Sequence, residues 1–317
     1  MIALRHPWLL LAVAPSVAAC TYEPTPSSET TTAGGGSGGV GGHAGGAGGS
    51  AGSTPTGGSG GTNTAGGGSP LPALVDDGII VRYYLDEAAD GQQPMELGDS
   101  APGPLPLPIS WQPEMGYVQD GKGNRGLEWT QAGANGMASA GVDGTKIVTA
   151  LHGSTVGTIE VVVDFKATGA DGACARMSTI ATANVAGSFA LCAPSITRAQ
   201  FGIDTSYRGG EWEVDFLGRG RLVLHAVLDT AQTDENLRAR LFLDGAEVPR
   251  IGGTAPQQDQ PLDLGVGSSY VIGNRPEGGR TPNGRVYYAA MYSVALTTEQ
   301  ILQNAGVLVS HDDAPAP

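Results

Sequence analysis

Three carboxylates at alternate positions are the residues of this chain that most resemble a catalytic set. They lie in the segment Glu211-Trp-Glu-Val-Asp215. Alternate side chains of a β-strand point to the same face, so Glu211, Glu213 and Asp215 would share one face of a strand. A pair of carboxyl groups flanking a glycosidic bond is what glycoside hydrolysis requires. The segment therefore raises the hypothesis of a glycoside hydrolase, and the interpretation we favour is the exposed, acidic face of an edge strand.

The aromatic residues are few for a sugar-binding cleft, which usually presents several of them. The chain has four Trp, and one of these lies in the apolar N-terminal segment. The others could form a stacking platform for sugar together with tyrosines, or they could fill a core. The residues in question are Trp111, Trp129, Trp212, Tyr287, Tyr288 and Tyr292. We expect most of them in the core, above all Trp129 and Tyr292.

Two histidines and a glycine-rich segment offer weaker signals. His152 and His225 have no Ser or Cys partner at a recognised spacing, and we expect His225 to be a hydrogen-bonded residue inside the sandwich. Gly121-Lys-Gly-Asn-Arg-Gly126 matches the dinucleotide fingerprint, but it leads into the strand-like residues 127–129. Since the fingerprint requires a helix N-terminus to hold the pyrophosphate, a turn between strands is the better interpretation.

The same turn has the residue spacing found at the start of a calcium-binding loop. Asp120, Lys122 and Asn124 have the alternate spacing of such a loop. The sixth position lacks Gly and the twelfth lacks Glu, which a calcium loop of this type needs. Carboxylates that simply order their own turn are the competing interpretation.

Residues 1–19 predict an export signal. Arg5 and His6 precede an apolar run that is too short to span a bilayer as a helix, and small residues precede Cys20. Val17-Ala-Ala-Cys20 resembles the bacterial lipobox, in which the Cys becomes the N-terminus and is acylated. An ordinary signal peptide cut near Ala19 is the alternative. We favour lipidation of Cys20, which would attach the protein to a membrane.

The composition divides the remaining chain into a tether, a domain and a tail. Residues 20–72 are rich in Gly, Ser and Thr with almost no large apolar side chain, so we expect a disordered tether. Residues 73–309, about 240 residues, fall within the range of a single all-β sandwich. We expect residues 310–317 to fray as a disordered tail. The formal net charge of −14 argues against nucleic acid and anionic lipid headgroups as partners, and is compatible with cations or neutral sugars.

Hydrophobic alternation predicts strands along the domain. In residues 221–229 both alternating sets are largely apolar, which indicates a strand covered on both faces. In residues 158–166 one set is apolar and the other is polar, with Glu160 in the polar set, so we expect that side to face water. Residues 240–248, 270–274 and 284–292 predict further strands, and Asp244-Gly245 supplies a hairpin turn.

One notable helix is predicted near the C-terminus. Thr297-Thr-Glu-Gln300 fits a capping box, with Thr297 as the N-cap residue, and the helix should run toward Leu308.

The cysteines predict a disulfide. Residues 176–182 and 188–193 indicate a hairpin, and Cys174 and Cys192 flank its turn at positions that should lie close together. Export permits disulfide formation, and lipidation of Cys20 would leave an even number of cysteines. We predict a Cys174–Cys192 disulfide, with two buried thiols as the alternative.

The order of these segments, with their particular residues, resembles the laminin-G-like, concanavalin A-like jelly-roll family. The main matching segments are Leu228-Asp229, Leu241-Phe-Leu-Asp-Gly245, Ile272-Gly-Asn274, Gly284-Arg-Val, Met291-Tyr-Ser-Val-Ala-Leu296 and Thr298-Glu-Gln-Ile301. Weaker matches lie upstream in Arg82-Tyr-Tyr-Leu-Asp-Glu87, Asp99-Ser-Ala101 and Gly126-Leu-Glu-Trp129. The resemblance covers roughly residues 75–309. It implies an antiparallel β-sandwich with a short C-terminal helix.

The resemblance also implies a function. Relatives bind polysaccharides or proteins at loop rims or on the concave face, so we expect a non-catalytic recognition or adhesion module. Some relatives bind calcium at rim loops, which makes Asp99 and Asp120 calcium candidates, and beyond calcium we expect no cofactor. Endo-glucanases of this fold carry Glu-x-Asp-x-Glu on one strand, and the order in residues 211–215 departs from it. A structural role in the cell envelope is the second hypothesis, and the hydrolase is the third.

The residue after the lipobox cysteine bears on location. Thr21, rather than Asp, follows Cys20. Among bacterial lipoproteins this favours sorting to the outer membrane of a Gram-negative cell, with the domain either periplasmic or exposed at the surface.

Overall fold

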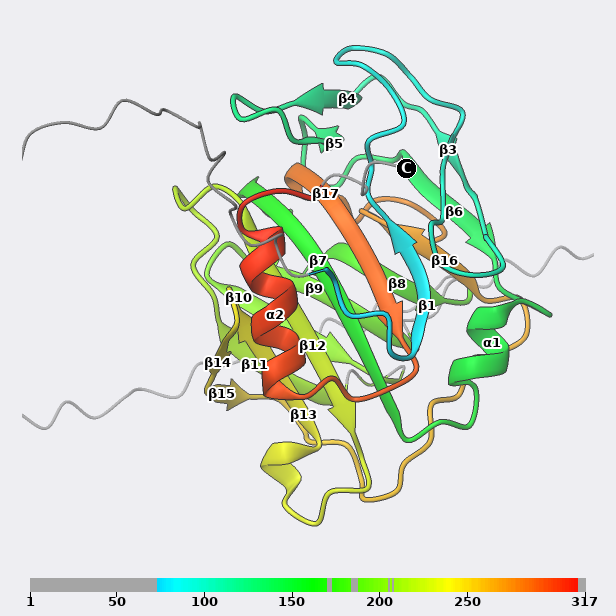
Figure 1. Cartoon of the computed structure of the whole chain (residues 1–317), viewed down its shortest axis with the longest axis vertical. Coiled ribbons are helices and arrows are strands. Elements are labelled where there is room, and N and C mark those ends of the chain that lie inside the picture. The colour runs from blue at the N-terminus through cyan, green and yellow to red at the C-terminus, as the bar shows by residue number, and fades with distance from the viewer. Residues whose placement is uncertain (1–72, 170–172, 184–187, 205, 207, 313–317) are drawn as a thin grey trace, which may run out of the picture. The chain divides into compact units, whose positions relative to one another are not determined.

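The computed structural model describes residues 73–169, 173–183, 188–204, 206 and 208–312. The predicted signal peptide, Cys20 and the tether lie outside the described residues, as do residues 313–317 of the tail. The described chain forms two antiparallel sheets packed face to face, which confirms the predicted β-sandwich (Figure 1). None of the helices in these ranges is long and apolar enough to cross a membrane.

The first sheet has eight strands. They are β1 (Ile79–Tyr83), β4 (Met115–Gln119), β5 (Arg125–Trp129), β7 (Val156–Ala167), β12 (Leu222–Asp229), β13 (Ala239–Leu243), β14 (Ala246–Val248) and β17 (Asn283–Tyr292). Their order is β14-β13-β12-β7-β17-β5-β4, and β1 pairs with β17.

The second sheet has nine strands. They are β2 (Glu96–Leu97), β3 (Leu107–Ser110), β6 (Met137–Gly141), β8 (Ala175–Ala181), β9 (Phe189–Ser195), β10 (Arg198–Gly202), β11 (Gly209–Glu213), β15 (Arg250–Gly252) and β16 (Ser269–Ile272). Their order is β15-β11-β10-β9-β8-β16-β6-β3-β2. The described helices are α1 (Lys146–Leu151), α2 (Thr298–Leu308) and the 3-10 helix η1 (Glu235–Leu237).

The hairpin predicted at Asp244-Gly245 is confirmed. Strands β13 and β14 pair across it, with Leu243 opposite Ala246. Asp244 has φ 50° and Gly245 has φ 86°, the left-handed backbone that a two-residue hairpin turn requires at both positions.

The Gly-Asn pair after β16 serves packing and loop geometry. Gly273 has φ 76°, and a Cβ at this position would overlap the ring of Trp129, which is fully buried between the sheets. The Asn274 side chain donates to the carbonyl oxygens of Ala134 and Gly136, at 3.3 and 3.1 Å. It also accepts hydrogen bonds from the backbone of the following loop. The pair therefore fixes a core tryptophan and braces two loops.

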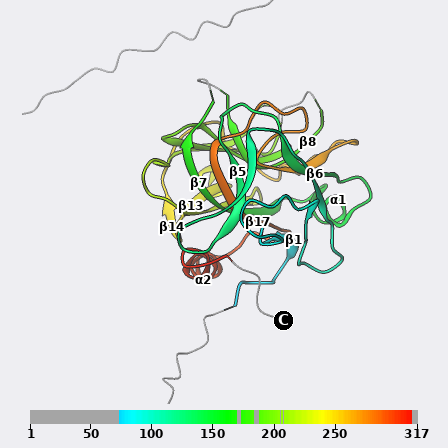
Figure 2. The same cartoon turned by 90° about the horizontal axis from the view of Figure 1, so that it is seen from above.

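The expectation that one side of residues 158–166 faces water was wrong for the first part of the strand, whereas Asp164 is half-buried and Lys166 is exposed. Glu160 and Thr158 on this side of β7 are fully buried. Helix α2 lies outside the first sheet and covers this face (Figure 2). The helix contributes Ile301, Ala305 and Leu308 to an apolar cluster with the sheet. The cover lies far along the chain from β7, so the local pattern of β7 gives no sign of it.

A buried polar cluster formed by Glu160, His225, Tyr292 and Asn304 lies beneath α2. Glu160 Oε2 accepts hydrogen bonds from His225 Nε2 at 2.7 Å and from Asn304 Nδ2 at 2.6 Å. Its Oε1 accepts from the Tyr292 hydroxyl at 3.0 Å. Burial opposes the charge on Glu160, but the hydrogen bond from His225, its charge and the hydrogen bond from Asn304 together lower the carboxyl pKa below its usual value. Glu160 is therefore an ionised acceptor, and His225 is the hydrogen-bonded sandwich residue expected from the sequence.

The same cluster holds the point where the chain enters the domain. Asn304 Oδ1 accepts from the backbone N–H of Val75 at 2.8 Å. Arg82 donates to the Val75 carbonyl and to Asp76, both at 2.6 Å, and to the Tyr288 hydroxyl at 3.1 Å. The entry segment, β17 and the C-terminal helix are therefore fastened together.

The capping box of α2 is confirmed. Thr297 accepts from the Gln300 N–H, and the Gln300 side chain accepts from the Thr297 N–H. Helix α1 was not predicted. It has six residues after the N-cap residue Thr145, which is too short to show a helical hydrophobic period.

Candidate functional site

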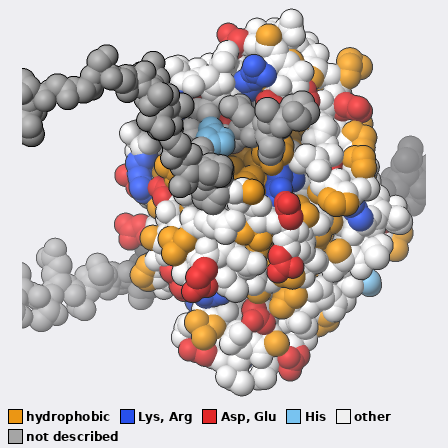
Figure 3. Space-filling view, in the orientation of Figure 1, with side chains coloured by type: hydrophobic (Ala, Val, Ile, Leu, Met, Phe, Trp, Pro, Cys, Tyr) orange, Lys and Arg blue, Asp and Glu red, His pale blue; other side chains and the backbone are white. Residues whose placement is uncertain are grey.

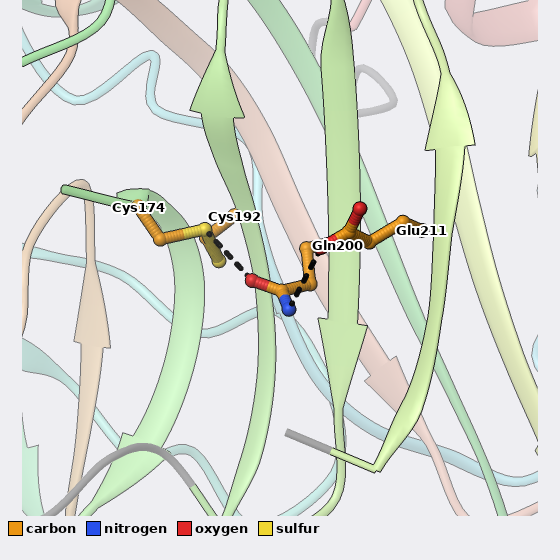
Figure 4. The surroundings of a disulfide bond; sticks show 4 residues. All are labelled: Cys174, Cys192, Gln200 and Glu211. Atoms are coloured by element: carbon orange, nitrogen blue, oxygen red, sulfur yellow. Dashed lines mark hydrogen bonds between the residues drawn. A yellow bond between two sulfur atoms is a disulfide. The ribbon is translucent and has the colours of Figure 1, made fainter. Parts of the chain in front are cut away.

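The predicted disulfide is confirmed between Cys174 and Cys192. Its sulfur atoms lie on the outer face of the second sheet, because the neighbouring residues Leu191 and Ala193 point into the core. Gln200 of β10 lies next to it and donates to Glu211 Oε1 at 3.5 Å (Figure 4). The disulfide thus belongs to the sheet face on which the first of the three carboxylates is located.

The three carboxylates occupy this outer face and the turn after it. Trp212, between Glu211 and Glu213, is buried in the core, so the two glutamates point the other way. Glu211 lies 3.6 Å from the Arg198 guanidinium, and Asp215 accepts the Leu217 N–H at 3.0 Å beyond the strand end. Strand β11 is the second from the edge, because β15 pairs with it, and not the edge strand we expected.

The calcium candidates are both engaged with donors of the protein. Asp99 accepts the N–H groups of Arg82, Ala101 and Leu105, and the Lys146 ammonium lies 2.6 Å from its Oδ2. A cation of the protein thus already pairs with this carboxylate.

Asp120 binds its own turn. It accepts the N–H groups of Lys122 and Asn124 and the Asn124 side-chain amide. Burial raises the pKa of Asp120, but these hydrogen bonds outweigh it and lower the pKa below its usual value. Among the residues that the structure describes, no group of three or more His, Cys, Asp or Glu is placed to hold a metal ion.

The aromatic residues fill the interior. Trp129, Trp212, Tyr287, Tyr288 and Tyr292 are each at most 1% exposed, as expected for core residues. Trp111 is half-buried and donates to the Pro94 carbonyl at 3.0 Å. Within the described ranges, the exposed large apolar side chains are aliphatic or Met: Met95, Leu217, Leu237, Ile251, Val266, Leu302 and Val309. On the face that carries α2, acidic side chains are scattered rather than gathered in one patch (Figure 3).

A polar pocket lies among the loops that follow β8 and β10 and precede β16. Its cavity volume is about 270 Å³. Polar side chains and a buried isoleucine contribute to its lining: Thr182, Ser188, Ile203, Asp204, Gln260 and Asp263. It is therefore a site that joins hydrogen-bonding groups to an apolar wall.

The acceptors of the polar pocket are held in place by hydrogen bonds. Asp204 Oδ1 accepts the N–H groups of Ser206 and Arg208 at 2.8 and 3.1 Å. Its Oδ2 accepts from Gln260 Nε2 at 3.3 Å, and Gln260 Oε1 accepts the Gln257 N–H at 2.9 Å. A carboxylate and an amide fixed in this way are preorganised to bind hydroxyl groups with little loss of side-chain freedom.

A second depression, the apolar pocket, adjoins the first across the segment 263–266. It has a cavity volume of about 360 Å³ and is lined by Asp143, Gly144, Val148, His152, Leu264 and Val266. Of all the residues lining the two pockets, only His152 was considered from the sequence. The missed signals are the Asp204-x-Ser-x-Arg208 stretch, whose first residue caps its own loop, and the apolar-polar-apolar pattern of Leu262, Asp263 and Leu264.

Several solved structures match the chain at low sequence identity. A mutant of HCR D/C VPI 5995 matches with a TM-score of 0.50 at 9% identity, over 74% of this chain and 53% of that chain. Trypanosoma rangeli sialidase in complex with sialic acid matches with a TM-score of 0.48 at 11% identity, over 73% of this chain and 33% of that chain. A third match is domain 4 of AbnA, an extracellular arabinanase from Geobacillus stearothermophilus, in complex with arabinotriose. Its TM-score is 0.41 at 12% identity, over 72% of this chain and 98% of that chain.

These matches concern the fold alone. The chain spans about a third of the sialidase chains and about half of the HCR chain. No protein-family model and no curated protein matches the sequence. The match with a TM-score of 0.50 agrees with a β-sandwich fold and says nothing about the function of this chain.

Proposed function

We propose that this chain is a non-catalytic recognition module that binds carbohydrate in the polar pocket. The observation that carries this proposal is the preorganised pair of Asp204 and Gln260 beside the apolar wall of Ile203. A carboxylate accepts hydrogen bonds from sugar hydroxyls, an amide donates and accepts, and an apolar wall packs against the C–H groups of a sugar ring.

The size and charge of the site favour a small, uncharged group. The cavity volume of about 270 Å³ lies at the small end for ligand pockets, which suits one sugar unit. The net charge of −14 would repel an anionic ligand. A neutral glycan therefore fits the site better than an acidic one.

The proposal includes display from a membrane through a lipid on Cys20, at the bacterial outer membrane. The chain enters the domain beside α2, where Gln303 donates to the Ala73 carbonyl at 2.6 Å. The polar pocket is built from other elements, namely the loops around β8, β10 and β16. A chain leading away from residue 73 at α2 therefore starts from a different part of the domain than the pocket.

The experiment is a glycan-array screen of the purified protein, with and without calcium, followed by analysis of products from every glycan that binds. We expect binding without cleavage, and loss of binding in Asp204→Asn. Cleavage that Glu211→Gln abolishes would overturn the proposal in favour of the hydrolase.

The calcium arm of the screen separates the remaining candidates. Binding that requires calcium and is lost in Asp99→Asn or Asp120→Asn would show that the ligand binds at those residues and not in the polar pocket. No binding to any glycan would refute the carbohydrate proposal and leave a protein ligand or a structural role in the envelope.

A further inference from the structure

The segment 263–266 forms a ridge between the polar and the apolar pocket. We infer that the ligand is an extended polymer of hydroxylated units that crosses this ridge, with one unit in the polar pocket and the next in the apolar pocket. This inference rests on the proposed function and specifies its ligand as a chain of at least two linked units.

The residues of the ridge border both pockets. Asp263 and Gly265 line the polar pocket, whereas Leu264 and Val266 line the apolar pocket. The Ser268 N–H donates to the Gly265 carbonyl at 3.1 Å, so the chain turns at Val266. The two depressions therefore share this segment as a common border, and a ligand that leaves one passes over the ridge to reach the other.

The ridge is held in place by hydrogen bonds to residues 152–154. Leu262 exchanges hydrogen bonds with residues 153 and 154: its N–H donates to the Ser154 carbonyl and its carbonyl accepts the Gly153 N–H, both at 2.8 Å. The Leu264 N–H donates to His152 Nδ1 at 3.3 Å. Leu262 and Leu264 are buried below the ridge, at 1% and 4% exposure. The ridge is therefore a fixed part of the surface.

Two side chains project from this fixed ridge toward solvent. The side chain of Asp263 is 88% exposed, and Val266 is 93% exposed. An isolated valine with that exposure costs hydration free energy that a ligand lying across it would recover. A single unit confined to the polar pocket would leave Val266 uncovered.

The apolar pocket offers a second unit both packing and hydrogen bonds. Val148 and Leu264 provide apolar walls. Because His152 Nδ1 accepts the Leu264 N–H, the neutral imidazole carries its proton on Nε2 and can donate to a ligand. Asp143 accepts the Gly267 N–H at 2.9 Å, which fixes the turn next to Val266 and leaves the carboxylate further acceptor capacity.

Linking the two units raises affinity without any new contact. Once the first unit is bound, the second is held at high effective concentration near its own pocket. The geometry therefore predicts that affinity depends on chain length up to the number of units that the two pockets hold.

The test is calorimetric titration of the purified protein with malto-, cello-, xylo- and manno-oligosaccharides of one to six units. In the series that binds, we expect Kd to fall at least about tenfold between one unit and two or three units, a gain of about 1.4 kcal/mol. The affinity should then change little with further units.

Two variants assign the gain to the ridge. Val266→Asp places a charge on the ridge without disturbing the core, so we expect it to reduce the gain with length more than the single-unit affinity. Ile251→Asp on β15, which is 51% exposed, is the matched control and should change neither. Asp204→Asn should weaken binding at every length.

The outcomes separate the two proposals. Equal affinity at all lengths, lost in Asp204→Asn, would overturn the two-pocket inference and keep recognition at the polar pocket. A length gain that survives in Val266→Asp would also overturn it. No binding to any of the four series, together with a silent array, would refute the carbohydrate function itself.

Discussion

Replacing Glu160 with Gln tests the buried polar cluster that joins the sheet to α2. The carboxylate accepts three hydrogen bonds, from His225, Asn304 and Tyr292. The amide of Gln keeps one oxygen and turns an NH₂ group toward a donor on the other side. It also removes the charge that faces His225.

The expected loss of stability in Glu160→Gln follows from the burial of these groups. A hydrogen bond to a charged group contributes about 1.5–3 kcal/mol, and leaving a buried donor without its acceptor costs about 1–3 kcal/mol. Because the bonds share one carboxylate, their energies do not add. We therefore expect Glu160→Gln to lower the free energy of unfolding by about 1.5–3 kcal/mol at pH 7.

The assay is urea unfolding followed by tryptophan fluorescence between pH 3 and pH 7. The folded pKa of Glu160 lies below its usual value of 4.5, so its ionised form stabilises the fold above that pH. This contribution is lost as the pH falls through the folded pKa. The difference between the wild type and Glu160→Gln should therefore narrow below about pH 4.5.

A surface glutamate supplies the control. Glu247 is half-exposed and lies 3.7 Å from Arg240, so Glu247→Gln should change stability by less than about 1 kcal/mol. If Glu160→Gln were as stable as this control at pH 7, the cluster would not hold α2 in the way we describe.

Three further variants test the packing by the same unfolding assay. Replacing Cys174 and Cys192 together by Ser should cost about 3 kcal/mol, because the bond closes a loop with a sequence separation of 18; an unchanged midpoint of unfolding would contradict this. Ile301→Ala should cost about 2–5 kcal/mol as a cavity under α2, whereas the exposed Leu302→Ala should have little effect. Gly273→Ala should cost about 1–3 kcal/mol through overlap with the Trp129 ring. A loss below about 0.5 kcal/mol, the usual range of surface substitutions, would argue against that contact.

The local features of the fold could be predicted from the sequence because local residues determine them. The alternation of apolar side chains predicted β12. Asp244-Gly245 predicted a hairpin whose turn needs left-handed backbone, and Thr297 with Gln300 predicted the start of α2. The disulfide followed from the hairpin register, since Arg176 of β8 lies opposite Cys192 of β9.

The environment of Glu160 could not be predicted in this way. Its polar neighbours in β7 indicate a solvated face, and only tertiary packing shows that α2 covers it. His225 lies opposite Glu160 in the β7–β12 register, which places the pair together. No spacing in the sequence shows this, because register between distant strands is set by the whole sheet.

The candidate site was missed for a related reason. Asp204 comes from one loop, whereas Gln260 and Asp263 come from another that lies 56 residues further along the chain, and loop residues carry no period that reveals their neighbours. The carboxylates with a recognisable spacing, Glu211 and Glu213, lie instead on an outer sheet face and line neither of the two pockets.

The most direct test of recognition at the polar and apolar pockets is a crystal structure of the protein bound to an oligosaccharide. The oligosaccharide should be the one with the lowest Kd in the length series. The account predicts density for one unit against Asp204 and Gln260, and for the next beyond Val266 toward His152. Density on the outer face of β11 beside Glu211 and Glu213, with the two pockets empty, would contradict it.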